Sequence, residues 1–210
     1  FVNPATAYVL TRNVLAVPRG AWLLQTAAGS ALGRMVIRLG KRFGFKTLCV
    51  TRRPEQADEL KSVGADAALS FDAAQDDPDA FVTAVQQTTG GGVAYAMDCV
   101  GGLTGSTVVR CLARNGQLVV FGTLSGEPLQ FASRALMTPG ASISGFWLGN
   151  YMESLKLTKK LGLVRTIAGL IREGVLASEI AESWPLPDFA AAISAAELPG
   201  HTGKSLLKIN

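Results

Sequence analysis

A turn of small residues, Ala27–Gly33, lies between a short apolar run and an amphipathic segment near the start of the chain. The run is Ala21–Thr26, and apolar residues after the turn recur every three or four positions as far as Arg42, which predicts a strand, a turn and a helix. A helix that begins at such a turn leaves backbone N–H groups unpaired at its positive end, and small residues let a ligand approach the backbone. The pattern predicts a pyrophosphate site. Because only the last glycine of a Gly-x-Gly-x-x-Gly motif is kept, a purely structural turn is the alternative.

The end of the next β-like run, Thr47–Val50, indicates which dinucleotide would bind. A protein that binds NAD usually has Asp or Glu about 20 residues after the glycine turn, where the carboxylate accepts the ribose hydroxyls. Here the run is followed by Thr51, Arg52 and Arg53, with no acid at the strand end. Two guanidinium groups can pair with a 2′-phosphate, so the sequence predicts NADPH as the cofactor. The alternative is a solvated basic loop balanced by the acids Glu55 and Asp58.

Strand and helix patterns alternate from Pro18 to Gly145. Beyond the segments above, we expect helices over residues 54–63, Pro78–Thr88 and Leu103–Leu112, and strands over Ala67–Phe71, Val93–Met97, Leu118–Phe121 and Ile143–Trp147. Helices and strands of these lengths in alternation imply a parallel sheet covered on both faces. The expected fold is α/β, a Rossmann-type doubly wound parallel sheet that binds a dinucleotide.

The composition changes after Asn150. We expect one long amphipathic helix within Tyr151–Glu173, a strand over Ile180–Leu186, a helix that Asp188 caps and that runs to Ala196, and a short strand over Gly203–Ile209. Residues 1–150 are therefore assigned to an NADPH-binding Rossmann-like domain with a lead-in helix, and residues 151–210 to a separate C-terminal piece.

Charge and cysteine usage exclude several classes of function. The net charge is +4 and the basic residues are scattered, without the basic stripe and interleaved aromatics of a nucleic-acid-binding surface. No apolar run reaches the ~20 residues of a membrane span, and no signal peptide is visible.

Cys49, Cys99 and Cys111 have apolar neighbours and are expected to be reduced core residues in a reducing compartment. Because the sequence has a single histidine, His201, which is expected in a solvated loop, and no CxxC pair, we predict no zinc site.

Five segments in order resemble the medium-chain dehydrogenase/reductase superfamily: Asn3–Tyr8, the small-residue turn, Lys61–Asp66, Asp98–Gly102 and Gly203–Leu207. Within it the chain looks most like zinc-independent quinone oxidoreductases and 2-enoyl thioester reductases. Zinc alcohol dehydrogenases commonly carry a zinc-ligand cysteine where this chain has Val2. Residues 50–55 and Gly145–Leu148 look particularly like mitochondrial-type enoyl thioester reductases.

The resemblance implies a split catalytic domain, of which residues 151–210 would supply a connecting helix and the C-terminal part. The larger N-terminal part would be absent, so the chain is expected to be a fragment whose catalytic residues cannot be assigned. The implied activity is NADPH-dependent hydride transfer to an activated C=C bond of a 2-enoyl thioester. The alternatives are an NADPH:quinone oxidoreductase and a non-catalytic NADPH-binding or redox-sensing module.

The expected assembly is a homodimer, paired through an edge strand at Ser142–Phe146, and the expected compartment is the cytoplasm, or the mitochondrial matrix in a eukaryote. Asp98 is expected to be a buried acceptor of its turn, whereas Thr6 and Tyr8 either touch the cofactor or pack the lead-in helix. The predicted cofactor-binding residues are Ala28, Gly29, Ser30, Ala31, Leu32, Arg52, Arg53, Val100, Gly101, Phe121, Gly122, Thr123, Phe146, Trp147 and Leu148.

Overall fold

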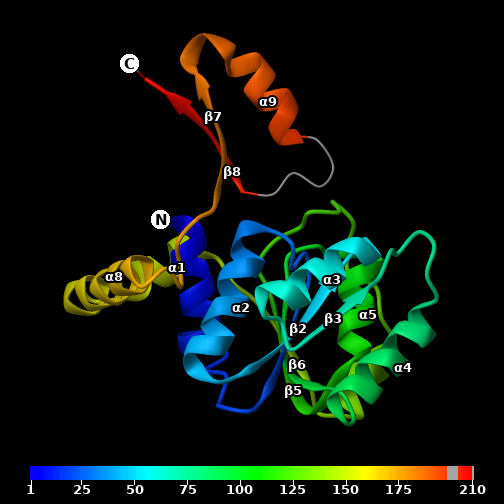
Figure 1. The fold of residues 1–210 in the computed structure, drawn as a ribbon. Helices are drawn as coiled ribbons and strands as arrows, with labels where there is room; N and C mark the ends of the chain where they lie inside the picture. The colour runs from blue at the N-terminus through cyan, green and yellow to red at the C-terminus, as the bar shows by residue number, and fades with distance from the viewer. Residues whose placement is uncertain (198–202, 210) are drawn as a thin grey trace.

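A parallel sheet forms the centre of the protein, with six strands in the order β3-β2-β1-β4-β5-β6 among the described residues (Figure 1). The computed structural model of the chain describes residues 1–197 and 203–209, so the expectation for His201 lies outside the described residues. The strands are β1 (Trp22–Gln25), β2 (Lys46–Thr51), β3 (Ala67–Ser70), β4 (Val93–Asp98), β5 (Leu112–Val120) and β6 (Ser142–Gly145). Every neighbouring pair is parallel, which confirms the predicted Rossmann-type sheet.

The strand order reverses at β1, which pairs with β2 on one side and with β4 on the other. In a doubly wound sheet the helices that follow β1 and β4 lie on opposite faces, and a crevice opens at the carboxyl ends of these two strands. The turns that follow β1, β2, β4, β5 and β6 all lie along this edge. The predicted site residues are therefore gathered at one edge of the sheet.

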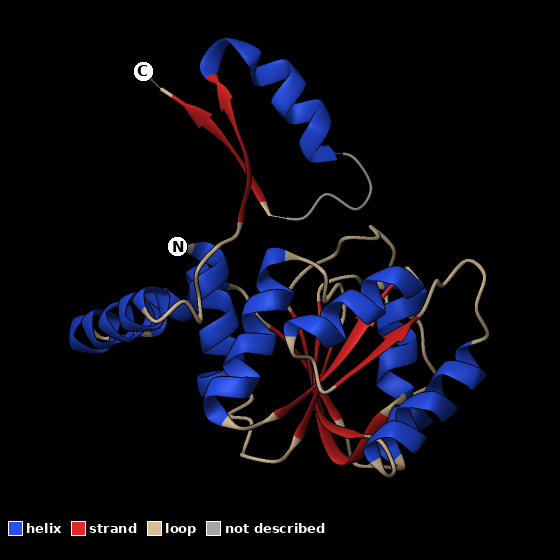
Figure 2. Cartoon of the chain, viewed as in Figure 1, coloured by secondary structure: helices blue, strands red, loops and turns tan. Residues whose placement is uncertain are grey.

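Helices cover both faces of the sheet (Figure 2). They are α1 (Val2–Tyr8) with the π-helix η1 (Val9–Val14), α2 (Ala31–Phe43), α3 (Pro54–Val63), α4 (Pro78–Thr89), α5 (Gly102–Arg110), the short α6 (Arg134–Met137), α7 (Leu148–Ser154) and α8 (Leu157–Arg172). Successive strand residues face opposite sides, so Leu23 packs with α1, α2 and α8, whereas Leu24 packs with α4 and α5. This alternation divides the buried side chains into two layers.

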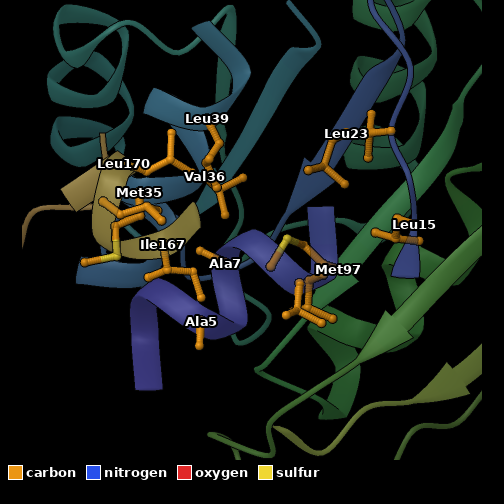
Figure 3. Close-up of a cluster of buried hydrophobic side chains, with 14 of the residues drawn as sticks. Ala5, Ala7, Leu15, Leu23, Met35, Val36, Leu39, Met97, Ile167 and Leu170 are labelled. Atoms are coloured by element: carbon orange, nitrogen blue, oxygen red, sulfur yellow. The ribbon is translucent and has the colours of Figure 1, made fainter. Parts of the chain in front are cut away.

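The α1 side of the sheet is closed by small residues and an aliphatic cluster (Figure 3). Ala5 and Ala7 of α1 are fully buried, and Ile167 and Leu170 of α8 lie in the same cluster. Met35 of α2 joins them from the next helix. Because alanine leaves room for neighbouring helices to approach, α1 can pack between α2 and α8.

The C-terminal residues form a second, smaller unit that stands apart from the main sheet in Figure 1. Its strands β7 (Ile180–Pro185) and β8 (Lys204–Lys208) pair in parallel, and they are accompanied by a 3₁₀ turn (Leu186–Asp188) and by α9 (Phe189–Glu197). The expected strands and helix of this region are confirmed. Within the described residues, no helix is both long and apolar enough to span a membrane.

The long amphipathic helix predicted within Tyr151–Glu173 is confirmed as α8. A separate short helix, α7, precedes it, because Leu155 and Lys156 adopt extended backbone between the two. The Ser154 hydroxyl donates to the Tyr151 carbonyl at 2.7 Å, which offers the backbone an alternative to a continuous helix.

One predicted boundary is wrong, at the passage from α5 into β5. The predicted helix ended at Leu112, but α5 ends at Arg110 and Leu112 already pairs with Val93 of β4. The strand was expected only from Leu118. In the structure it begins six residues earlier and contains an irregularity, because the register with β4 shifts between Val93 and Tyr95 and Asn115 adopts a left-handed φ of 56°. Pairing with β4 here overrides the local turn pattern.

Candidate functional site

The turn after β1 presents the start of α2 to the carboxyl edge of the sheet. Ser30 is the N-cap residue, and its hydroxyl accepts a hydrogen bond from the Gly33 N–H at 3.1 Å. No acceptor among the described residues is recorded for the backbone N–H groups of Gly29, Ala31 and Leu32. The first turn of α2 also has no acidic residue. Free N–H groups at the positive end of a 13-residue helix can bind a phosphate group.

Gly33 is the one position of this turn where the packing admits no side chain. A Cβ placed on Gly33 would lie 2.6 Å from both the Cα and the carbonyl carbon of Ala28, which are backbone atoms and cannot rotate away. Helix α2 therefore approaches the turn closely. The side chain of Gln25 in β1 holds this approach, because its Nε2 donates to the Gly33 carbonyl at 3.0 Å.

A buried arginine supports the same turn from within α2. The Arg34 Nε donates to the Gly29 carbonyl at 3.3 Å, and one terminal nitrogen lies 2.6 Å from the Glu59 carboxylate of α3. The Arg34 side chain is only 6% exposed. Its guanidinium thus ties the turn to the helix that follows Arg52 and Arg53.

On one side of the turn lies a cavity of about 530 Å³, the arginine pocket. It is lined by Ala27, Gly29, Ser30, Val50, Thr51, Arg52, Arg53, Gln56, Phe71, Asp72, Ala73, Ala74, Val100, Thr104, Leu124 and Ser125. Arg52 is exposed and Arg53 is half-buried. Neither arginine forms an ion pair with any described residue, and Asp58 pairs with Lys61 instead.

The acid that does line this pocket is engaged within its own loop. The Asp72 carboxylate accepts hydrogen bonds from the Ala74 N–H at 3.1 Å and from the Gln75 Nε2 at 3.2 Å. The pocket therefore offers two cationic side chains that form no ion pair with any described carboxylate. Such a pair fits a phosphate group better than it fits a free ribose.

Asp98 is a buried acceptor, as predicted, and it shapes the turn after β4. Its carboxylate accepts from the Thr26 hydroxyl at 2.6 Å, the Val100 N–H at 3.0 Å and the Gly101 N–H at 2.9 Å. These two N–H groups are thus used inside the protein. Gly101 and Gly102 have positive φ angles of 75° and 54°, a conformation that favours glycine.

On the other side of the turn lies a second cavity of about 560 Å³, the apolar pocket. Its lining residues are Val2, Asn3, Thr6, Leu32, Phe121, Phe146, Trp147, Leu148, Gly149 and Met152. Only Asn3 and Thr6 among them have polar side chains able to hydrogen-bond a ligand, apart from the indole N–H of Trp147. Thr6 of the lead-in helix lines this pocket, whereas Tyr8 packs edge-on against Phe43.

The predicted site residues are divided between these two cavities. Gly29, Ser30, Arg52, Arg53 and Val100 line the arginine pocket, whereas Leu32, Phe121, Phe146, Trp147 and Leu148 line the apolar pocket. The remaining five line neither: Ala28, Ala31, Gly101, Gly122 and Thr123.

Sequence reasoning missed several lining residues of both pockets. Asp72, Ala73 and Ala74 follow β3, and the rule that ligands bind at carboxyl ends of strands would have found them. Gln56 reaches back from α3, with its amide nitrogen 3.2 Å from where a Gly29 Cβ would lie. Gly149 and Met152 belong to α7, a short helix that was not predicted from the sequence.

The cysteines behave as core residues. Cys49 and Cys111 are buried, Cys99 is half-buried, and all three are free thiols. Burial raises the pKa of Cys49 and Cys111 to about 12 and that of Cys99 to about 11. Such thiols are poor nucleophiles near neutral pH. Across the residues that the structure describes, no group of three His, Cys, Asp or Glu side chains is placed to hold a metal ion.

Comparison with known proteins relates both fold and sequence to oxidoreductases. The pattern of the family described as zinc-binding dehydrogenase matches residues 31–168. The human mitochondrial enoyl-[acyl-carrier-protein] reductase is 28% identical over 211 residues, which is 98% of this chain and 55% of the human protein. The chain thus spans about half the length of the curated relatives it matches.

Two solved structures have the same fold as this chain. A Bacillus thuringiensis protein assigned as an NADPH:quinone reductase superposes with a TM-score of 0.86 at 25% identity, and the match covers all of this chain and 62% of that one. The Escherichia coli quinone oxidoreductase, solved in complex with NADPH, gives a TM-score of 0.83 at 24% identity over all of this chain and 63% of that chain.

Proposed function

This chain belongs to the zinc-binding dehydrogenase family within the medium-chain dehydrogenase/reductase superfamily, and on that premise we propose that it binds NADPH across its two pockets. The arginine pocket would take the adenosine half, with the 2′-phosphate at Arg52 and Arg53. The start of α2 would take the pyrophosphate, and the apolar pocket would take the nicotinamide. The observation that carries this proposal is the pair of arginines without a carboxylate partner.

The preference for NADPH over NADH can be estimated from these contacts. Each charge-assisted hydrogen bond to the 2′-phosphate could contribute ~1.5–3 kcal/mol before screening by salt. Since ~1.4 kcal/mol is a factor of ten, NADPH should bind roughly ten- to several-hundred-fold more tightly than NADH.

The test is calorimetric titration of both cofactors into the wild type and into Arg52→Ala/Arg53→Ala. The double variant should lose most of the NADPH preference and keep its NADH affinity nearly unchanged. Arg114→Ala/Arg165→Ala is the matched control, because it removes two exposed arginines outside both pockets. Equal affinities of the wild type for NADPH and NADH would refute the proposed role of the arginines.

We further propose that the protein is a reductase of an activated C=C bond, and that its substrate is a 2-enoyl thioester. When bound, NADPH supplies a hydride from nicotinamide C4, and that chemistry belongs to the cofactor. Leu32, Phe121 and Phe146 would exclude water from the place where the hydride and the acceptor carbon meet. Two features support this choice: the apolar lining, and the 28% identity to a human protein named as an enoyl reductase.

An NADPH:quinone oxidoreductase is the second candidate, favoured by the fold match to the Bacillus thuringiensis protein. A third, non-catalytic candidate is an NADPH-binding or redox-sensing module. NADPH oxidation by the protein against panels of enoyl-CoA esters and quinones separates the three. Turnover of the enoyl esters supports the leading proposal, turnover of quinones alone supports the second, and NADPH binding without turnover supports the third.

The assembly that we propose is a homodimer paired through β6. This strand is the edge of the sheet, and its residues are mostly exposed, so its outer hydrogen-bonding groups are available to an identical strand. Light scattering over a dilution series should give twice the 22.0 kDa mass of the chain.

The human relative is named as mitochondrial, and we expect that compartment for this chain if its source is a eukaryote.

A further inference from the structure

A buried arginine lies directly behind the turn that would hold the pyrophosphate. Arg34 is the fourth residue of α2, and its side chain is 6% exposed. It lines neither the arginine pocket nor the apolar pocket, so it is not placed to touch a cofactor bound in them. Any effect of Arg34 on binding would therefore act through the turn itself.

The guanidinium of Arg34 connects three segments of the chain. Its Nε donates to the Gly29 carbonyl at 3.3 Å, and one terminal nitrogen donates to the Glu59 carboxylate at 2.6 Å. The other terminal nitrogen lies 4.0 Å from the carboxylate of Glu179, which immediately precedes β7. Helix α3, which carries Glu59, packs beside α2 (Figure 1). One side chain therefore links the turn after β1 to α3 and to the start of β7.

The Gly29–Ser30 peptide unit is fixed at both of its edges. Arg34 binds the carbonyl oxygen of this unit, and the Ser30 N–H donates to the Ala27 carbonyl at 3.0 Å. Because a peptide unit is planar, two hydrogen bonds on opposite edges set its orientation. Glycine has more backbone freedom than any other residue, so Gly29 depends on such contacts to hold one conformation.

The position of the Gly29 carbonyl decides what a phosphate group would meet at the start of α2. A carbonyl oxygen carries partial negative charge, and one that turned toward a phosphate would repel it. Here Arg34 engages that oxygen inside the protein, while the N–H groups of Gly29, Ala31 and Leu32 have no acceptor among the described residues. Donors that are held ready in this way bind an anion without the cost of reorganising the turn.

Stability alone is a poor explanation for a guanidinium at this position. Burial removes the charge from water, and a buried ion pair is often no more stabilising than well-packed apolar side chains of similar volume. The side chain of Glu59 is 43% exposed, so solvent screens its attraction to Arg34. A cation close to the start of a helix also opposes the helix dipole. A residue that breaks local rules in this way is expected at a functional site.

We propose that Arg34 is a positioning residue for pyrophosphate binding, which holds the Gly29 carbonyl so that the N–H groups at the start of α2 stay free and oriented. The inference rests on the proposed binding of NADPH at this turn. Arg34 strengthens the binding of ligands with a phosphate group at the turn and has no effect on ligands that lack one. It therefore acts on NADPH and NADH alike, whereas Arg52 and Arg53 act on NADPH alone.

The experiment is calorimetric titration of three ligands into the wild-type chain and its variants. The ligands are NADPH, NADH and adenosine 2′-monophosphate, which carries the 2′-phosphate but no pyrophosphate. Arg34→Met removes the guanidinium and keeps an unbranched apolar side chain. Arg34→Lys keeps the charge but offers a single nitrogen, which cannot hold Gly29 and Glu59 in the way that the guanidinium fork does.

Arg38→Met is the matched control, because Arg38 lies one turn further along the same helix and is tied as firmly. Its guanidinium donates to the carbonyls of Val175 at 2.9 Å and Ala177 at 2.7 Å, and to the Glu179 carboxylate at 3.0 Å. None of these contacts involves the turn. The control therefore removes a helix α2 arginine and its ion pair without releasing Gly29.

Arg34→Met should weaken NADPH and NADH by about tenfold each, because misdirected N–H groups lose hydrogen-bond geometry. The ratio of the two affinities should stay as in the wild type, and the affinity for adenosine 2′-monophosphate should not change. Arg34→Lys should show the same pattern with a smaller loss of about threefold, and it decides the question if the methionine variant does not fold. Arg38→Met should leave all three affinities unchanged.

An equal loss for adenosine 2′-monophosphate would show that Arg34 supports the fold as a whole, and a loss confined to NADPH would place its effect at the arginine pocket. Either result overturns the proposal, as do unchanged dinucleotide affinities in the Arg34 variants or an equal loss in Arg38→Met. A wild type that binds neither dinucleotide would instead refute the proposed function, and the role of Arg34 would fall with it.

Discussion

Replacing Gly33 by alanine tests whether this helical position requires glycine because the backbone of Ala28 lies too close for a side chain. The new Cβ would lie 2.6 Å from the Cα and the carbonyl carbon of Ala28, about 1 Å inside ordinary carbon–carbon contact. Both are backbone atoms, so helix α2 must move away from the turn. Alanine gains up to ~1 kcal/mol in helix propensity, but overpacking of this kind typically costs ~1–3 kcal/mol and occasionally more. We expect a net loss of stability.

Gly162→Ala is the matched control, because a Cβ on Gly162 in the middle of α8 meets nothing within 4 Å. For a chain of this size, ~1 kcal/mol shifts the melting temperature by roughly 2–4 °C. With a net loss of ~1–2 kcal/mol, thermal denaturation should show Gly33→Ala lower by roughly 2–8 °C and Gly162→Ala higher by roughly 1–4 °C. NADPH affinity should fall about tenfold or more in Gly33→Ala alone, since displaced N–H groups lose hydrogen-bond geometry. If both variants melt at higher temperature than the wild type, the close approach of α2 to the turn is not what requires glycine.

Three further changes test other parts of the structure. Asp98→Asn places an amide NH₂ against groups that need an acceptor, so chemical denaturation should show a loss of ~2–4 kcal/mol; a loss below ~1 kcal/mol would contradict that role. Ala27→Gly should raise the melting temperature by roughly 2–4 °C per ~1 kcal/mol gained, because Ala27 adopts a left-handed φ of 47°; a lower melting temperature would show that this backbone is not strained. The buried thiols of Cys49 and Cys111 hold their protons to about pH 12, against 9.0 in an unfolded chain, so their contribution to stability is complete below pH 9 and is lost as the pH rises from 9 toward 12. Melting temperatures at pH 8 to 11 should therefore fall more steeply in the wild type than in Cys49→Ala/Cys111→Ala, and parallel curves would contradict the raised pKa values.

Much of the Rossmann-type sheet could be predicted because each of its elements has a strong local signal. The glycines after α2, α3 and α4 end their helices in the left-handed conformation, as Gly44, Gly64 and Gly90 all show. Pro54 and Pro78 mark the first turns of two of these helices. Boundaries that depend on pairing were predicted less well. The start of β5 at Leu112 follows from its pairing with β4 and not from its own sequence.

The candidate site shows the same division. Arg52 and Arg53 could be placed because the end of β2 must lie at the carboxyl edge of a parallel sheet. Gln56 and Met152 could not, because their positions depend on how α3 and α7 pack. The buried face of α8 was equally out of reach, since Leu161 and Leu163 have the same side chain and only the fold decides which of them is buried.

Hydrogen exchange of the backbone amides, with NADPH and with 2′,5′-ADP, tests most directly whether one dinucleotide spans both pockets. The whole of NADPH should protect residues 29–33 at the turn, 52–56 beside the arginines and 146–149 in the apolar pocket. The fragment 2′,5′-ADP lacks the nicotinamide half, so it should protect residues 52–56 and leave 146–149 unchanged. Protection of 146–149 by both ligands, or no protection of 52–56 by NADPH, would contradict the proposed placement of the cofactor.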